Sequence, residues 1–365
     1  MGFDRVAERF VGKNVIAIAA SHPLPLDVSG LLQVLNDSLD GPLGNADLNR
    51  YLPNCPYDIG TTYHQEGKNR DARPYFVAAR QSFESAKDRM GVARCTAMMG
   101  VLDNEAGDYL SAQRSYMQSL ESCEAIGWRL GAAFCLGYLC NNFFALGDYA
   151  SASLHNGRAL SLSRELADEN GIANALDTDG LIHLIQGRHV EAERLCAQAL
   201  QLYQQMGDRR GEAFAMTHLG MIALEHGDIS AADVHFTQAN KSRAVLGDTA
   251  SLVDSKAGLA SAHHQRDTSD GALAIVGDRL EHLARFGTEG VEFPFWVYAI
   301  CSDIVLDAAR SDATKGSRLH QQAGQLLDAG QRELARRAAL IDDPAARRRF
   351  ITDGPFHHLL ASSSS

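Results

Sequence analysis

Apolar residues along most of this chain recur three and four positions apart, which is the spacing of one face of an α-helix. Between residues 53 and 290, glycine and aspartate interrupt these periodic runs at regular intervals. The strict alternation of apolar and polar residues that indicates half-buried strands is not the prevailing pattern of the chain. We therefore expect an all-α protein made of many short helices joined by tight turns.

Small residues place these helices in one register with a period of 40 residues. Each unit predicts a helix A, a short turn, a helix B and a second turn, with an alanine at the same place in every helix B. The six alanines are Ala72, Ala112, Ala152, Ala192, Ala232 and Ala272. Because such units bury their apolar faces against their neighbours, the register predicts a right-handed superhelical solenoid of stacked antiparallel helix pairs.

Glycines are predicted to end the helices, because glycine adopts the left-handed conformation beyond a helix C-terminus at little steric cost. One set stands five residues before the helix B alanines: Gly67, Gly107, Gly147, Gly187 and Gly227. In three units the next residue, Asp108, Asp148 or Asp228, is predicted to cap helix B with its carboxylate. The turns between units are assigned to two further sets: Gly127, Gly207, Gly247 and Gly287, and Gly91, Gly131, Gly171 and Gly211.

The register divides the chain into three parts. Residues 1–52 are expected to form a degenerate N-terminal helical cap, and residues 53–290 six regular repeats of 40 residues. Residues 291–365 are expected to form a slipped terminal repeat, capping helices and a flexible serine tail, since terminal repeats are commonly atypical. The aromatic run Phe293-Pro294-Phe295-Trp296 opens a helix there and is assigned to the core, with an exposed docking patch as the alternative.

Within the clearest units, a small residue on helix A precedes the helix B alanine by twelve positions, as in the pair Gly220 and Ala232. Five further pairs keep this spacing: Gly60 with Ala72, Gly100 with Ala112, Cys140 with Ala152, Gly180 with Ala192, and Ala260 with Ala272. In this respect the chain resembles a tetratricopeptide repeat protein over at least residues 53–290. The consensus tryptophan and the terminal proline of that repeat are absent.

The longer unit is similar to the subclass with 40-residue repeats, of which Gly207-Asp208-Arg209-Arg210-Gly211-Glu212-Ala213 is an example in this chain. That subclass resembles the sensor regions of bacterial ATPase-type transcriptional regulators, and also peptide-pheromone receptors and spindle-orientation scaffolds. The resemblance implies a module that binds a protein, a peptide or a small effector. A regulator would need its nucleotide-binding and DNA-binding parts elsewhere, because the repeats carry neither motif.

In such solenoids helix A lines the inner groove, so the groove residues can be predicted from the register. Asparagine side chains there could bond to the backbone of an extended peptide, while aromatic residues and methionine could accept its apolar side chains. The predicted ligand contacts are Arg94, Asn104, Phe134, Asn141, Phe144, Asn174, Asp177 and Met221. The alternative for each residue is packing between neighbouring helices.

Composition limits the class of partner. The net charge of -11 argues against direct nucleic-acid binding by the repeats, which needs a basic surface. Seven cysteines without a C-x-x-C pair are typical of buried free thiols in the cytoplasm. The apolar run from Val15 to Ala20 is too short to span a membrane. No cofactor or metal motif occurs, and the oligomeric state is left open.

An enzyme remains the alternative to a binding module, since the predicted groove contains Asp177, His64 and His264. The two histidines lie five repeats apart and are not expected to meet, so the chain is interpreted as non-catalytic. Near the C-terminus, six arginines are interpreted as a solvated capping face: Arg332, Arg336, Arg337, Arg347, Arg348 and Arg349. A phosphate-binding or partner-binding role is the alternative for this cluster.

Overall fold

The computed structural model describes residues 54–65, 68–247, 251–266, 269–288, 290–311 and 316–362. The N-terminal cap expected for residues 1–52, and Gly67, lie outside these ranges. Within them the chain forms sixteen helices, and no strand occurs in this part of the molecule. The all-α architecture predicted from the helical periodicity is therefore confirmed.

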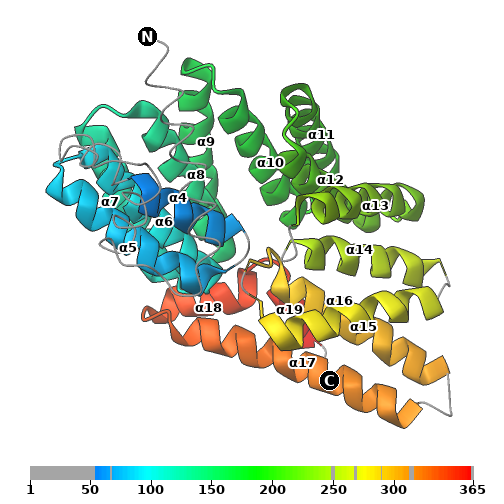
Figure 1. Cartoon of the computed structure of the whole chain (residues 1–365). Helices are drawn as coiled ribbons and strands as arrows, with labels where there is room; N and C mark the ends of the chain where they lie inside the picture. Colours follow the sequence, from blue (N-terminus) through cyan, green and yellow to red (C-terminus); the bar gives the residue numbers. More distant parts are fainter. Residues whose placement is uncertain are drawn as a thin grey trace, which may run out of the picture.

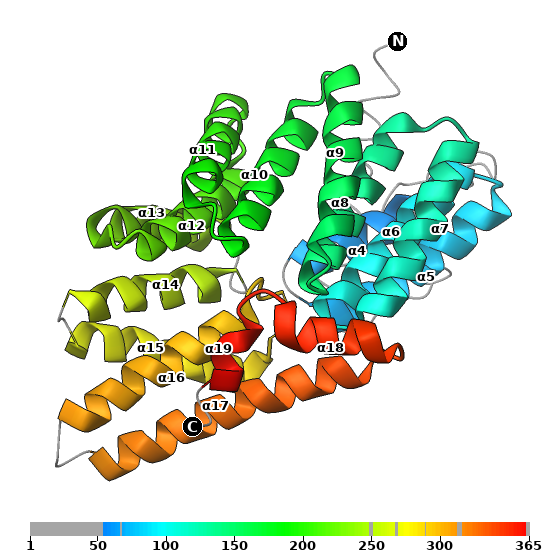
Figure 2. The ribbon, with the colours of Figure 1, turned by 180° about the vertical axis from the view of Figure 1, so that it is seen from behind.

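Fourteen of these helices pack as seven consecutive pairs that stack into a curved solenoid (Figures 1 and 2). The pairs are α4 (Asn54–Gln65) with α5 (Asn69–Ser85), α6 (Arg89–Glu105) with α7 (Tyr109–Ala125), α8 (Arg129–Ala145) with α9 (Tyr149–Glu165), α10 (Glu169–Ile185) with α11 (His189–Met206), α12 (Arg209–Glu225) with α13 (Ile229–Leu246), α14 (Leu252–Gln265) with α15 (Ser269–Phe286), and α16 (Pro294–Ser311) with α17 (Gly316–Ala339). Two short helices, α18 (Pro344–Asp353) and α19 (His357–Ser362), follow the last pair.

The helix B alanines lie at the contacts between helices, as predicted. All six, from Ala72 to Ala272, are completely buried. The small residue opposite leaves no space either: a methyl group added at Gly180 would reach 3.1 Å from the carbonyl oxygen of Ala192. Close packing of the two backbones therefore requires a small side chain on each helix, which explains the twelve-residue pairing in the sequence.

The turns follow the predicted pattern with one correction. Gly107, Gly147, Gly187 and Gly227 adopt positive φ after helix A, and the carboxylates of Asp108, Asp148 and Asp228 accept bonds from backbone amides of helix B. The prediction that Gly91, Gly131, Gly171 and Gly211 form turns is wrong, because these residues lie inside the first turn of each helix A. Glycine is needed there because a larger residue would collide with a side chain, such as that of Phe83 beside Gly91.

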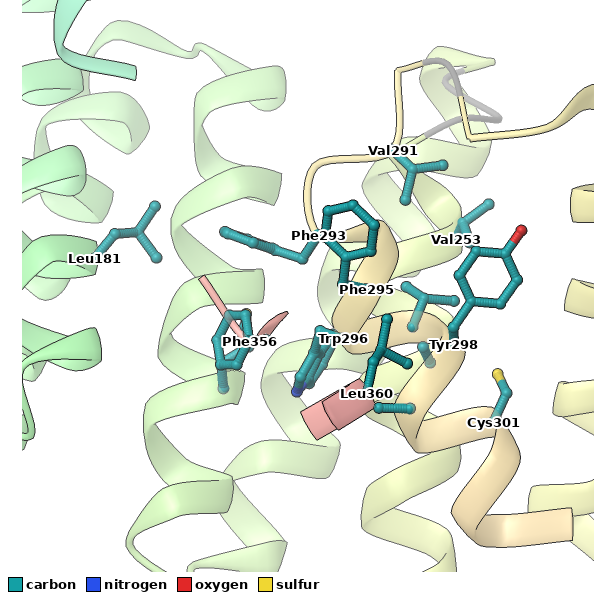
Figure 3. Close-up of a cluster of buried hydrophobic side chains, with 14 of the residues drawn as sticks. Leu181, Val253, Val291, Phe293, Phe295, Trp296, Tyr298, Cys301, Phe356 and Leu360 are labelled. Atoms are coloured by element: carbon teal, nitrogen blue, oxygen red, sulfur yellow. The ribbon is translucent and has the colours of Figure 1, made fainter. Parts of the chain in front are cut away.

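The aromatic run near residue 295 belongs to the core, as expected. Helix α16 begins at Pro294, and Phe293, Phe295 and Trp296 are all at least 95% buried. In Figure 3, Phe356 and Leu360 come from the C-terminal segment and lie beside this aromatic run. The slipped register before α16 thus creates a core that the last residues of the chain help to complete.

The long helix α17 runs back toward the first half of the solenoid (Figures 1 and 2). Its C-terminal part contacts the α6–α7 turn, and α18 contacts the α8–α9 turn. The interpretation of the arginine cluster as a solvated face is wrong for Arg337, which is only 3% exposed. Its guanidinium donates to the hydroxyl of Tyr109 over 2.7 Å and forms an ion pair with Glu333. A buried arginine is stable here because its donors meet oxygen acceptors from both halves of the molecule.

We expect the substitution Ala192→Leu to lower the free energy of unfolding by roughly 2 kcal/mol, because the site has no space for a larger side chain. The substitution Ala197→Leu on the exposed side of the same helix is the control and should change it by less than about 0.5 kcal/mol. Urea unfolding followed by circular dichroism measures both changes. Equal effects at the two positions would contradict the close contact at Ala192.

Candidate functional site: an inner cavity closed by the C-terminal helices

The inner face of the solenoid contains a cavity of about 360 Å³ between the A helices and the C-terminal part of the chain. Its first wall comes from α6, α8, α10 and α12 and includes Asn104, Asn141, Phe144, Asn174, Asp177 and His218. Its second wall comes from the segment before α16 and from the returning C-terminal helices and includes Val291, Glu292, Phe293, Arg337, Pro355 and His357. The cavity thus joins residues that are far apart in the sequence.

Five of the eight ligand contacts predicted from the register line this cavity: Asn104, Asn141, Phe144, Asn174 and Asp177. Asn141 and Asn174 are exposed on successive A helices, whereas Phe144 and Asp177 are nearly buried in the wall. The amide oxygen of Asn174 accepts a bond of 2.8 Å from the hydroxyl of Tyr203. That bond fixes the orientation of the amide beside the cavity.

The other three predicted contacts lie away from the cavity. Met221 is 2% exposed and packs in the hydrophobic core. The guanidinium of Arg94 lies 4.1 Å from the ring centre of Tyr57, near the N-terminal end of the described solenoid. Phe134 is 42% exposed on α8 and does not reach the cavity wall. A role in ligand binding stays a prediction for all eight residues.

His218 is a buried histidine of the cavity wall that lies between two carboxylates. Its Nδ1 lies 2.9 Å from Asp177 Oδ2, and its Nε2 lies 3.2 Å from Glu292 Oε1. Burial by itself would lower the pKa of His218, but the two carboxylates outweigh it and raise that pKa to about 10. The imidazolium therefore holds α10, α12 and the segment before α16 together at neutral pH.

The segment that carries Glu292 is fixed by a second buried carboxylate, that of Asp254 on α14. The backbone amides of Glu292 and Phe293 donate to it over 3.0 and 2.9 Å. Burial raises the pKa of Asp254 to about 7, and the neighbouring carboxylate of Glu292 adds to this effect. Asp254 and His218 thus position Glu292 from two sides.

The second wall is built around Arg337 and His357. Arg337 donates to Tyr109, to Glu333 and, over 3.0 Å, to the hydroxyl of Thr288. Burial lowers the pKa of His357 to about 3, so its imidazole is neutral at physiological pH. The ring is oriented by a bond between its Nδ1 and the carbonyl of Phe350.

The arrangement offers hydrogen bonds and apolar contacts to a ligand, and one oxygen of the wall has no partner of its own. Asp177 Oδ1 is buried and unbonded, while its Oδ2 contacts His218. The two groove histidines considered for catalysis do not line the cavity: His64 pairs with Glu105, and His264 pairs with Asp307. Among the described residues no cluster of metal-ligating side chains is placed to hold an ion, and no helix is long and apolar enough to cross a membrane.

The sequence pattern missed several residues of the site. His218 lies two positions before Gly220, and Thr178, at the same place before Gly180, also lines the cavity, so the register could have found both. No such signal exists for Arg337 or Glu292. Arg337 reaches the cavity because α17 folds back, and Glu292 reaches it from the segment before α16; neither belongs to a repeated position.

Comparisons with known proteins agree with this architecture. Residues 171–241 match the family model described as a tetratricopeptide repeat, whereas no curated protein sequence matches with significance. A Rap protein complexed with competence and sporulation factor aligns with a TM-score of 0.60 at 14% identity, covering 98% of this chain and 97% of that one.

Two further solved structures share the fold. Aspartyl phosphate phosphatase F from Bacillus subtilis aligns with a TM-score of 0.53 at 17% identity, over 82% of this chain and 75% of that one. A signal transduction ATPase with numerous domains and a tetratricopeptide repeat sensor, from Pyrococcus horikoshii, gives a TM-score of 0.57 at 12% identity. That alignment covers 96% of this chain and 52% of the ATPase.

At these identities the structural likeness concerns the fold alone. The family match covers the α10–α13 region, and the same pairing of helices and buried alanines continues on both sides of it. Solenoids of this type present an inner surface on which other molecules bind. Residues 171–241 therefore match the tetratricopeptide repeat, and the described part of the chain has the fold of a helical solenoid of that type.

Proposed function

We propose that this chain is a non-catalytic sensing module that binds a small ligand, either a short peptide or a metabolite of similar size, in the inner cavity. The observation that carries the proposal is the cavity itself. Its volume of about 360 Å³ lies in the range of small-ligand pockets, which is roughly 300–1,000 Å³.

The chemistry of the walls supports a ligand with amide or other hydrogen-bonding groups. Asn104, Asn141 and Asn174 can each donate and accept, and Phe144, Phe214 and Phe293 provide apolar surface between them. Asp177 adds an acceptor that is already desolvated. Such a mixture of few polar groups on an apolar surface is typical of sites that orient a small ligand.

The aligned structures support a signalling context. One is a Rap protein in complex with competence and sporulation factor, and another is an ATPase whose tetratricopeptide repeats form its sensor. We infer a role as the effector-binding part of a bacterial signalling or transcriptional regulator in the cytoplasm. A stand-alone peptide receptor or assembly scaffold is the alternative. A reading frame that continues into an ATPase or DNA-binding segment would support the regulator, and a small peptide gene beside it the receptor.

The double substitution Asn141→Ala/Asn174→Ala tests the binding site. The wild-type protein is screened against peptides of two to six residues and a metabolite set, with thermal stabilisation as the readout. For a ligand found in this way, we expect the double variant to bind roughly 30-fold more weakly, because two hydrogen bonds of about 1 kcal/mol each are lost. Isothermal titration calorimetry measures the two affinities.

The matched control is Gln118→Ala/Gln198→Ala, which removes two exposed amides from the B helices α7 and α11. It should bind like the wild type, and both double variants should keep the helical circular dichroism spectrum. Full affinity in Asn141→Ala/Asn174→Ala would place the ligand elsewhere. A catalysed turnover abolished by one substitution in the cavity would overturn the non-catalytic assignment.

A further inference from the structure

The first wall of the cavity is built by the repeats. The second wall is in place only while the C-terminal part of the chain contacts the first half of the solenoid. The segment from Glu333 to His357, here named the C-terminal latch, supplies Arg337, Pro355 and His357 to the second wall. We propose that this latch opens and closes the cavity by releasing and regaining its contacts with two turns of the first half of the chain. The inference deepens the proposed function, because it concerns access to the same cavity.

The first latch contact is with the turn between α6 and α7. Arg337 donates to the hydroxyl of Tyr109 over 2.7 Å, and Arg336 donates to the carbonyl oxygen of Ala106 over 2.9 Å. Gly107 lies directly against the side chain of Arg337, where an added methyl group would come within 2.7 Å. The turn thus fits the latch closely, and its glycine leaves the space for the arginine.

The second latch contact is with the turn between α8 and α9, one repeat further on. The hydroxyl of Tyr149 donates to the carbonyl oxygen of Asp353 over 2.5 Å, and Arg349 pairs with Asp148 over 3.2 Å. A methyl group on Gly147 would come within 2.9 Å of the Asp353 backbone. Two successive repeats therefore present the same kind of glycine turn to the latch.

The polar contacts are joined by one ring contact, since the ring centroids of Tyr109 and Phe350 lie 5.6 Å apart, and the latch is also anchored on its own side. Phe350 and Leu360 are completely buried, and α19 packs against α16 and α17. The curvature of a solenoid is the sum of small rotations between neighbouring repeats, so it changes without unfolding any repeat. Release of the two turns would then let the halves of the solenoid move apart and widen the cavity.

The test weakens the second latch contact at its solvent-accessible edge with Tyr149→Phe/Arg349→Glu. The phenylalanine keeps the ring packing on Phe144 but cannot donate to Asp353, and the glutamate repels Asp148. Asp148 keeps its capping bond to Ser151, which uses the other carboxylate oxygen. The controls are Arg348→Glu, which makes the same charge change at an exposed neighbour, and Arg349→Lys, which preserves the ion pair.

Hydrogen–deuterium exchange of the ligand-free proteins is the first readout. We expect amides in residues 344–357 and in the α8–α9 turn to exchange at least tenfold faster in Tyr149→Phe/Arg349→Glu, with α12 and α13 unchanged. Both controls should exchange like the wild type. Spin labels at Leu154 on α9 and Ile351 on α18, two exposed positions, should show a shift to longer distances in the same variant.

Unchanged exchange and unchanged distances in Tyr149→Phe/Arg349→Glu would overturn the latch. An equal response to Arg348→Glu would also overturn it, because net charge rather than the contact would then be responsible. Faster exchange throughout the molecule would show global destabilisation and contradict an independent opening. Neither readout uses a ligand, so these outcomes are separate from failure of the Asn141→Ala/Asn174→Ala experiment.

Discussion

Replacement of Arg337 by alanine is expected to lower the free energy of unfolding by about 3 kcal/mol, as the loss of one partner from a buried ion pair typically does. The arginine side chain is 4% exposed. Its loss leaves the Tyr109 hydroxyl and the Thr288 hydroxyl without their charged donor, and it opens a void beside Gly107. The substitution should therefore destabilise the second wall of the cavity more than any change of an exposed arginine.

Urea unfolding followed by circular dichroism measures this effect, with Arg332→Ala on the exposed side of α17 as the control. The control should change the free energy of unfolding by less than about 0.5 kcal/mol. Arg337→Lys should restore only part of the loss, because an ammonium group cannot make the three bonds of the guanidinium at once. A loss below about 1 kcal/mol in Arg337→Ala would mean that Arg337 contributes little to the closed structure.

The second large loss of stability is expected for His218→Leu, which removes the imidazolium between Asp177 and Glu292. At pH 7 the change should cost roughly 3 kcal/mol, because two carboxylates then face each other without a cation. The substitution His226→Leu, at the exposed C-terminal end of the same helix, is the control. Retention of wild-type stability in His218→Leu would contradict the charged state assigned to this histidine.

The pH dependence provides an independent check on His218. Its pKa in the folded protein is about 10, above the ordinary value of 6.5. The stability that it contributes is therefore fully present below pH 6.5 and is lost as the pH rises toward 10. Between pH 7 and 8.5 we expect the difference in unfolding free energy between wild type and His218→Leu to shrink by on the order of 2 kcal/mol.

Asp254 changes the unfolding free energy below pH 7, and its protonation stabilises the fold, as does that of His218. Its pKa of about 7 in the folded protein lies above the ordinary value of 3.8, so the folded state binds a proton more readily than the unfolded chain. Stability from this group therefore increases as the pH falls from 7 toward 4. The measurement on His218 is made above pH 7 so that Asp254 contributes little to the difference.

The sequence by itself determined the repeating part of the fold and the inner face of its helices. Ala112 and Gly100 predict a close contact because only small side chains let two helix backbones approach, and that requirement recurs every 40 residues. The same register placed Asn141 and Asn174 on adjacent A helices, where both line the cavity. These features are readable because each repeat contacts mainly its sequence neighbours.

Only the tertiary structure decided how the cavity is closed. Arg337 meets Tyr109 across 228 positions, and Tyr149 meets Asp353 across 204, at places that no periodic pattern marks. In the sequence Arg337 is one of several arginines in a polar helix, and nothing local distinguishes it from the exposed Arg332. Its burial follows from the summed rotations of the repeats between the two ends, a property of the whole chain.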